Sequence, residues 1–200
     1  MHQERTDAFD EVKCNHGDMG EQSVYDDLEP KIHQRIAEAV ADAVPVLDIA
    51  CGDGRLTGFI ASGSGSKTYG VDISVSHLAE AWEKAEARGI SHLMRLAAGD
   101  ARNLCFLDEA FGSLIMLYSL HEIRRLPQAL DEARRVLRPG GKIIVVDPIK
   151  GGKAETLWNE SYYSLAEIES MLTRAGFSDL TSDFLYDDIV FVSAKKVPIY

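Results

Sequence analysis

The chain has 200 residues, of which 46% are hydrophobic and 26% charged, so we expect a packed core, and global disorder is excluded. The formal net charge of −11 disfavours binding to nucleic acid and to anionic membranes, because both carry negative charge. No run of about 18 apolar residues exists to span a membrane. The three widely spaced cysteines form no disulfide framework and, with the histidines, no set with metal-ligand spacing. We therefore expect a cytoplasmic protein that binds no nucleic acid, inserts stably into no membrane and has no metal site.

The hydrophobicity pattern changes twice along the chain. Residues 1–23 are polar and predict a loose arm, whereas 24–43 has the spacing of an amphipathic helix. After Pro45, short apolar runs alternate with amphipathic segments, which is typical of a parallel sheet with helices on both faces. The expected strands are 46–50, 68–73, 92–97, 113–118, 142–146, 177–184 and 189–195. The expected helices are 25–43, 55–61, 75–88, 127–137 and 165–175, with a flexible loop over 62–66. We expect Trp82 to face inward and the Arg-Pro-Gly-Gly stretch at 138–141 to stop the fourth helix.

A glycine turn joins the first expected strand to the next helix, in VLDIACGDGR at residues 46–55. Gly52 and Gly54 let the backbone approach a ligand closely, and the helix N-terminus offers free N–H groups to a carboxylate or phosphate. Asp72 ends the second strand, 24 residues after Asp48, near the spacing at which an acid binds ribose hydroxyls. The turn and Asp72 share one edge of the sheet and predict a nucleotide-type site. The alternative is that both acids only cap turns.

The glycine spacing also bears on which nucleotide binds. A dinucleotide fingerprint that starts at Gly52 and Gly54 needs a third glycine at position 57, where this chain has Thr57. Asp48 fits poorly beside a pyrophosphate because both are negative, but it fits well beside the ammonium group of a methionine. This charge argument favours S-adenosylmethionine over NAD.

Five segments together resemble the class I S-adenosylmethionine-dependent methyltransferases, in particular the type 11 group that includes ubiquinone/menaquinone-biosynthesis methyltransferases. The matching segments are VLDIACGDGR (46–55), GVDIS (70–74), AGDARNLCF (98–106), SLIMLYSLHEI (113–123) and EARRVLRPGGKIIVVDP (132–148). The resemblance is close over residues 45–148. It implies a Rossmann-like, doubly wound α/β fold with seven strands in the order 3-2-1-4-5-7-6 and the last strand antiparallel.

The resemblance implies a role for each matching position. The positions that would surround the methionine part of the cofactor are Asp48, Ala50, Gly52, Gly54, Leu117 and Tyr118. Asp72 would bind the ribose hydroxyls, and Ile73 would pack on the adenine. Asp100 would accept a hydrogen bond from the adenine amino group, and the Ala101 backbone N–H would bind the ring. Tyr25, at the start of the first helix, could close over the methionine carboxylate as a lid.

Methyl transfer from a sulfonium needs alignment and exclusion of water, and a base only where the acceptor carries a proton that must leave. His121 follows the fourth strand and is the candidate base or substrate contact; its alternative is a structural hydrogen bond to a loop carbonyl. The segment 149–163 contains Trp158, Tyr162 and Tyr163, which could wall a substrate pocket or pack beneath a loop.

The sequence therefore favours a methyltransferase that acts on a small-molecule or lipid-like acceptor. A non-catalytic module that binds S-adenosylmethionine or S-adenosylhomocysteine is the alternative, and a nicotinamide-dependent oxidoreductase is disfavoured by the missing third glycine. We expect a single domain over residues 1–200. Its parts are an arm (1–23), a helix (24–43), a cofactor-binding core (45–148) and a substrate-side part (149–200).

Overall fold

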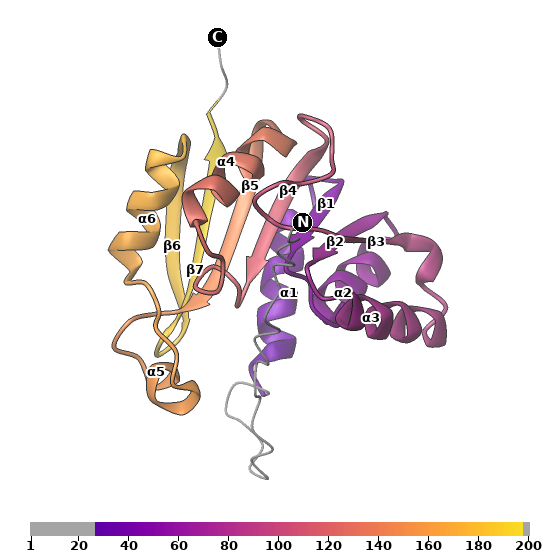
Figure 1. Cartoon of the computed structure of the whole chain (residues 1–200), viewed down its shortest axis with the longest axis horizontal. Coiled ribbons are helices and arrows are strands. Elements are labelled where there is room, and N and C mark those ends of the chain that lie inside the picture. Colours follow the sequence, from indigo (N-terminus) through magenta and orange to yellow (C-terminus); the bar gives the residue numbers. More distant parts are fainter. Residues whose placement is uncertain (1–26, 198–200) are drawn as a thin grey trace, which may run out of the picture.

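The structure is a computed structural model that describes residues 27–197. Within these residues seven strands form one sheet in the order β3-β2-β1-β4-β5-β7-β6, with β7 antiparallel to both of its neighbours (Figure 1). The strands are Val46–Ile49 (β1), Thr68–Asp72 (β2), Met94–Ala98 (β3), Phe111–Leu117 (β4), Leu137–Pro148 (β5), Phe177–Tyr186 (β6) and Ile189–Lys196 (β7). The expected strand order and the antiparallel last strand are confirmed.

Helices cover both faces of this sheet (Figure 1). They are Glu29–Val40 (α1), Arg55–Ser64 (α2), Val75–Ala87 (α3), Leu126–Val136 (α4), Lys153–Trp158 (α5) and Leu165–Arg174 (α6), with a 3₁₀ turn at Ser91–Leu93. Apolar residues of α4 and α6 pack with one face of the central strands, and those of α1 and α2 pack with the other. No helix in the described part of the chain is both long and apolar enough to cross a bilayer.

The two central strands, β1 and β4, end beside β2 at one edge of the sheet. β1 is buried along its whole length, and β4 nearly so, as expected for parallel strands covered on both faces. Ile49 at the end of β1 lies opposite Val71 of β2 on one side and Met116 of β4 on the other. The residues that follow these three strands therefore meet at one edge of the sheet.

Several local expectations were wrong. α2 continues to Ser64 through the segment expected to be a flexible loop, because the Gly65 N–H caps the Ala61 carbonyl from a left-handed conformation. Trp82 is 44% exposed rather than inward, since the inner face of α3 is taken by alanines and Leu78.

Other element boundaries also differ from the expectation. The stretch 138–141 belongs to the long strand β5 and not to a separate stop segment, and α5 lies where no helix was expected. α1 begins at Glu29 and ends at Val40, inside the expected limits. The arm 1–23 and Tyr25 lie outside the described residues.

The connection between α1 and β1 presses against the start of β4. The Gly112 N–H donates to the Pro45 carbonyl over 2.9 Å. A Cβ at Gly112 would lie 2.5 Å from the Ala43 carbonyl oxygen and 2.8 Å from that of Val44. Only glycine fits here without moving backbone.

We therefore predict that Gly112→Ala lowers the free energy of unfolding by roughly 1–3 kcal/mol, the usual cost of overpacking a buried position. Gly63→Ala is the matched control, because Gly63 lies in α2 with open space around its Cβ position. The control is expected to be neutral or to stabilise by about 0.5–1 kcal/mol. Urea unfolding of the two variants measures both effects, and equal stabilities would contradict the close approach.

Candidate functional site

At the ends of two neighbouring strands, a residue other than glycine has a left-handed backbone conformation. Ala50 follows β1 with a φ of 57°, and Tyr118 follows β4 with a φ of 51°. This conformation costs roughly 1–2 kcal/mol for such a residue, and strained backbone of this kind gathers at ligand sites. Both residues, with Leu117 before Tyr118, were expected beside the methionine part of the cofactor. The structure brings all three to the same edge of the sheet.

Asp72 connects the two turns that leave β1 and β2. Its Oδ2 accepts the backbone N–H of Gly52 over 2.7 Å, and its Oδ1 accepts that of Ser74 over 2.8 Å. The carboxylate is buried at the end of β2. An ionised carboxylate has about four lone-pair positions, so these two bonds leave acceptor capacity for ribose hydroxyls.

The two glycines of the turn have different surroundings. A Cβ at Gly52, which has a φ of 50°, would meet nothing within 4 Å among the described atoms, so the backbone there is open to a ligand. A Cβ at Gly54 would lie 2.7 Å from the Ala81 Cβ of α3. Gly54 is thus required by the packing of α2 on α3, whereas Gly52 offers the open approach.

Asp48 is only 2% exposed and lies below the turn. The Thr57 hydroxyl donates to its Oδ2 over 2.6 Å. Burial raises the pKa of Asp48 to about 7; the Thr57 hydrogen bond opposes this shift, and the nearby charge of Asp72 adds to it. Near neutral pH this carboxyl would therefore be stabilised in its ionised form by a cation such as an ammonium group.

The residues expected around an adenine lie next to the end of β2. Ile73 is 65% exposed, so its side chain is free to pack against a ring. Asp100 follows β3 and already accepts from the Arg102 Nε over 2.9 and 3.0 Å. The hydrogen bond from Arg102 holds the pKa of Asp100 below its ordinary value. An adenine amino group would therefore share Asp100 with Arg102. Ala101 is half-buried against the core.

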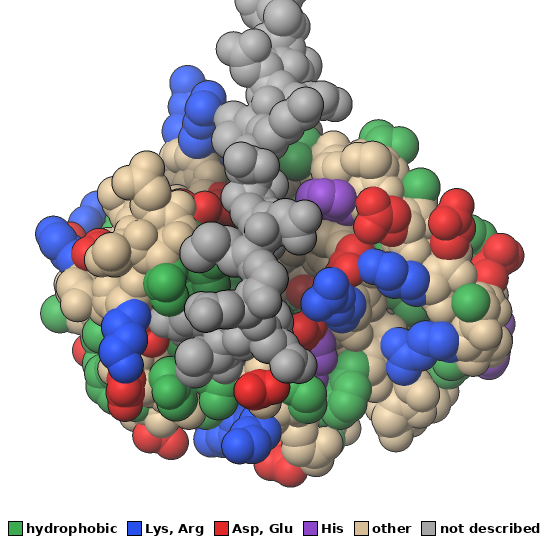
Figure 2. All heavy atoms as spheres, turned by 90° about the horizontal axis from the view of Figure 1, so that it is seen from below, with side chains coloured by type: hydrophobic (Ala, Val, Ile, Leu, Met, Phe, Trp, Pro, Cys, Tyr) green, Lys and Arg blue, Asp and Glu red, His purple; other side chains and the backbone are tan. Residues whose placement is uncertain are grey.

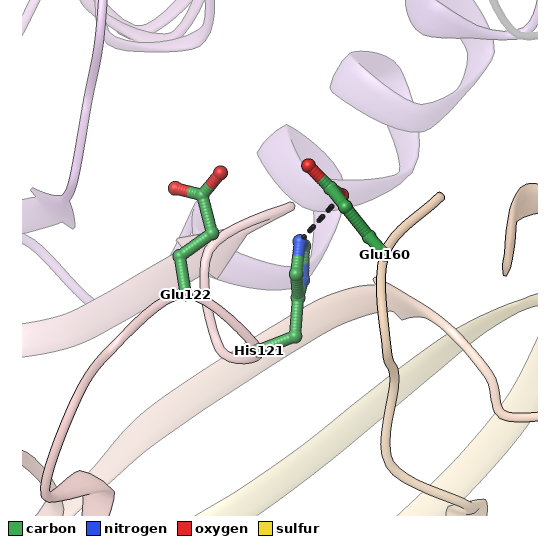
Figure 3. A group of neighbouring side chains, drawn as sticks. All are labelled: His121, Glu122 and Glu160. Carbon is green, nitrogen blue, oxygen red and sulfur yellow. Dashed lines mark hydrogen bonds and ion pairs between the residues drawn. The ribbon is translucent and has the colours of Figure 1, made fainter. Parts of the chain in front are cut away.

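His121 lies between the carboxylates of Asp147 and Glu160, and Figure 3 shows its pairing with Glu160. Its Nδ1 lies 2.9 and 3.0 Å from the two oxygens of Asp147, and its Nε2 lies 3.2 Å from the Glu160 Oε2. The Tyr162 hydroxyl donates to the same Glu160 oxygen over 2.8 Å, and the Tyr162 ring is 4.4 Å from the imidazole. The ring nitrogens therefore face carboxylates, not the loop carbonyl considered as the alternative from the sequence.

Comparison with known proteins agrees with this geometry. Residues 47–145 match the family model described as a methyltransferase domain. The chain is 36% identical over 140 residues to sterol 4-C-methyltransferase strm-1 of Caenorhabditis elegans, covering 69% of this chain and 42% of that protein. It is 34% identical over 110 residues to the ubiquinone/menaquinone biosynthesis C-methyltransferase UbiE of Paracoccus denitrificans, covering 54% and 44%.

This chain belongs to the class I S-adenosylmethionine-dependent methyltransferases. The cofactor of the family is S-adenosylmethionine. The chain spans less than half the length of these two curated relatives.

Solved structures show the same fold at low sequence identity. The [4+2]-cyclase SpnF superposes with a TM-score of 0.71 at 22% identity, covering 82% of this chain and 80% of that one. Phosphoethanolamine N-methyltransferase 2 of Haemonchus contortus, in complex with S-adenosylmethionine, superposes with a TM-score of 0.67 at 20% identity. The match covers 76% of this chain and 48% of that one. One fold thus carries different chemistries.

The partners of His121 were missed from the sequence. Asp147 had a usable signal, because it is an acid in an otherwise apolar run at the carboxyl end of the strand next to β4. Glu160 had none, since it lies in an irregular segment between α5 and α6. Tyr162 is buried and its ring packs against that of His121, while Trp158 is partly exposed.

The same group of side chains bears on metal binding. Ligand atoms of His121, Glu122 and Glu160 lie within 4.8 Å of one another and point into a common space (Figure 3). His121 and Glu160 already pair with each other, so we assign no metal to this group. On the side where β4 and β5 end, acidic and basic side chains are interspersed over the visible described surface (Figure 2).

The raised pKa of Asp48 makes the stability of the protein depend on pH. The folded-state value of about 7 lies above the ordinary value of 3.8, so the stability that this proton provides is complete below pH 3.8 and is lost as pH rises through 7. We predict that Asp48→Asn is more stable than the wild type at pH 8, by roughly 1–4 kcal/mol, and close to it at pH 4. Cofactor affinity should fall, because the amide cannot attract an ammonium group.

Thermal unfolding and calorimetric titration with S-adenosylhomocysteine measure these two effects. Asp179→Asn is the control, because it removes the same charge from an exposed carboxylate beside Lys195. If Asp48→Asn were less stable than the wild type at pH 8, the buried Asp48 would be ionised there at no cost in stability.

Proposed function

We propose that the chain transfers a methyl group from S-adenosylmethionine to a small-molecule or lipid-like acceptor by in-line displacement. The observation that carries this proposal is the pairing of His121 with the buried Asp147, beyond the end of β4. This pair lies outside the set of residues assigned to the cofactor, so a protein that only bound the cofactor would not need it. The names of the relatives, a sterol and a quinone methyltransferase, agree with an apolar acceptor.

The proposed cofactor pose follows the edge of the sheet. The methionine part would lie over the turn at 50–54 with its ammonium toward Asp48, and the ribose hydroxyls would donate to Asp72. The adenine would pack on Ile73 and donate from its amino group to Asp100. The open space at Gly52 and the exposure of Ile73 support this direction.

The reaction requires little covalent chemistry from the protein. As the acceptor's lone pair forms a bond to the methyl carbon, the carbon–sulfur bond breaks and its electron pair stays on sulfur. The protein aligns the two reactants and excludes water. His121 accepts the proton of an acceptor that must lose one. We place the cofactor on residues 45–148 and the acceptor against residues 149–200, within a single domain.

We predict that Asp72→Ala weakens binding of S-adenosylhomocysteine about tenfold to hundredfold. The variant loses the ribose acceptor and releases the Gly52 and Ser74 N–H groups, and hydrogen bonds to a charged group contribute roughly 1.5–3 kcal/mol. Calorimetric titration gives the dissociation constant, with Glu83→Ala on the exposed face of α3 as the control. An unchanged constant would place the ribose elsewhere.

A transfer assay separates catalysis from binding alone. The wild type, incubated with S-adenosylmethionine labelled in the methyl group and an extract of small molecules and lipids, should label an acceptor. His121→Ala should retain cofactor affinity and lose activity, by about 10²–10⁴-fold if His121 is the base. Tight cofactor binding with no labelled product from any fraction would instead support the non-catalytic module.

A further inference from the structure

The contacts of His121 favour one protonation state of its ring. Asp147 is a carboxylate, so Nδ1 must donate to it, and Nε2 faces a second carboxylate, Glu160. A neutral imidazole has only one N–H, and its other nitrogen carries a lone pair. A lone pair facing a carboxylate oxygen at 3.2 Å would be repelled. With both carboxyl groups ionised, this arrangement requires an imidazolium in which both nitrogens donate.

We propose that Asp147 and Glu160 position the proton transfer at His121 in two different ways. Asp147 is the permanent partner of Nδ1, whereas Glu160 occupies the place of the acceptor's proton-bearing atom and is exchanged for it when the acceptor binds. Neither residue was expected from the sequence. The inference rests on the proposed function, since it says which atom of the site meets the acceptor.

The surroundings of the two carboxylates support this difference. Asp147 is 0% exposed, lies in β5, and is held by the pairing of β5 with β4 on one side and β7 on the other. The Glu160 side chain is 38% exposed and lies between α5 and α6, outside any helix or strand. Its other partner, the Tyr162 hydroxyl, is on the same segment. Glu160 can therefore leave Nε2 without breaking the sheet, while Tyr162 stays in the core.

The charges that face His121 agree with an imidazolium at rest. Burial by itself lowers the pKa of His121, but Asp147, Glu122 and Glu160 together outweigh burial and raise it. These groups come from β5, from the loop after β4, and from the segment after α5. Tyr162, the remaining titratable neighbour, stays neutral because burial and Glu160 raise its pKa.

The exchange of Glu160 for the acceptor defines a reaction cycle in which His121 gives up and regains a proton. When Glu160 withdraws, the Nε2 proton leaves to solvent and the lone pair faces the acceptor. The acceptor atom then forms its bond to the methyl carbon, the electron pair of the broken bond stays on sulfur, and the acceptor's proton moves to Nε2. Asp147 stabilises the imidazolium that results, and Glu160 returns as the product leaves. The acceptor class is therefore one with an N–H, an O–H or an acidic C–H at the methylated atom.

Nuclear magnetic resonance titration of the His121 ring tests this inference without any acceptor. We expect the wild type to titrate above the ordinary histidine range, Glu160→Gln to titrate lower, and Asp147→Asn lower still. Glu155→Gln is the control, because it neutralises a carboxylate that caps the Gly151 N–H on the same stretch of chain. It should leave the His121 titration unchanged.

Two results would overturn the inference. The first is a His121 titration that is the same in Glu160→Gln as in the wild type. The second is a titration that appears only after treatment with a chelator, which would make the group a metal site. Should Asp147→Asn fail to fold, the exposed Glu160→Gln variant still decides the question.

Activity gives a second readout once an acceptor is known. Glu160→Gln should move the acidic limb of the kcat/KM profile to lower pH, because free Nε2 then exists at lower pH. A purely structural Glu160 would lower activity equally at all pH values. Because the ring titration does not depend on transfer, it can succeed or fail independently of the proposed function.

Discussion

The Asp72 carboxylate holds together the two turns that follow β1 and β2, through the Gly52 and Ser74 N–H groups. These bonds connect the segment after β1 to the segment after β2. Among the described residues, no other side chain bonds the backbone of both segments. The two bonds fix the open backbone at Gly52 and the exposed Ile73 relative to each other. Because Asp72 is buried and bonded by backbone, the edge is organised before any ligand arrives, which reduces the cost of ordering on binding.

The surroundings of His121 are built differently from this edge of the sheet. There the residues that contact one another come from separate parts of the chain, and one of them, Glu160, is in an irregular segment. Secondary structure therefore fixes the edge around Asp72 more fully than the surroundings of His121. The superposition with a protein named as a [4+2]-cyclase shows that the fold by itself fixes no reaction.

The sequence predicts the order of the sheet and the place of the glycine turn, because both depend on local patterns. Alternating apolar runs define the strands, and the turn at 46–55 is contiguous. The expected end of α2 was one turn too early, because Ser and Gly are common in loops. In the structure Gly65 caps the helix after Ser64. The partners of His121 could not be found by spacing, since Asp147 is 26 residues away and Glu160 is 39. Only the packing of β5 beside β4 brings the first of them into contact.

The central claim is that the cofactor lies across the ends of β1, β2 and β4. A crystal structure with S-adenosylhomocysteine tests it most directly. The account predicts both ribose hydroxyls at about 2.5–3.0 Å from the Asp72 carboxylate oxygens, with the sulfur facing the His121 side of the edge. A ribose bound away from Asp72, or a ligand seated on another part of the sheet, would contradict the account.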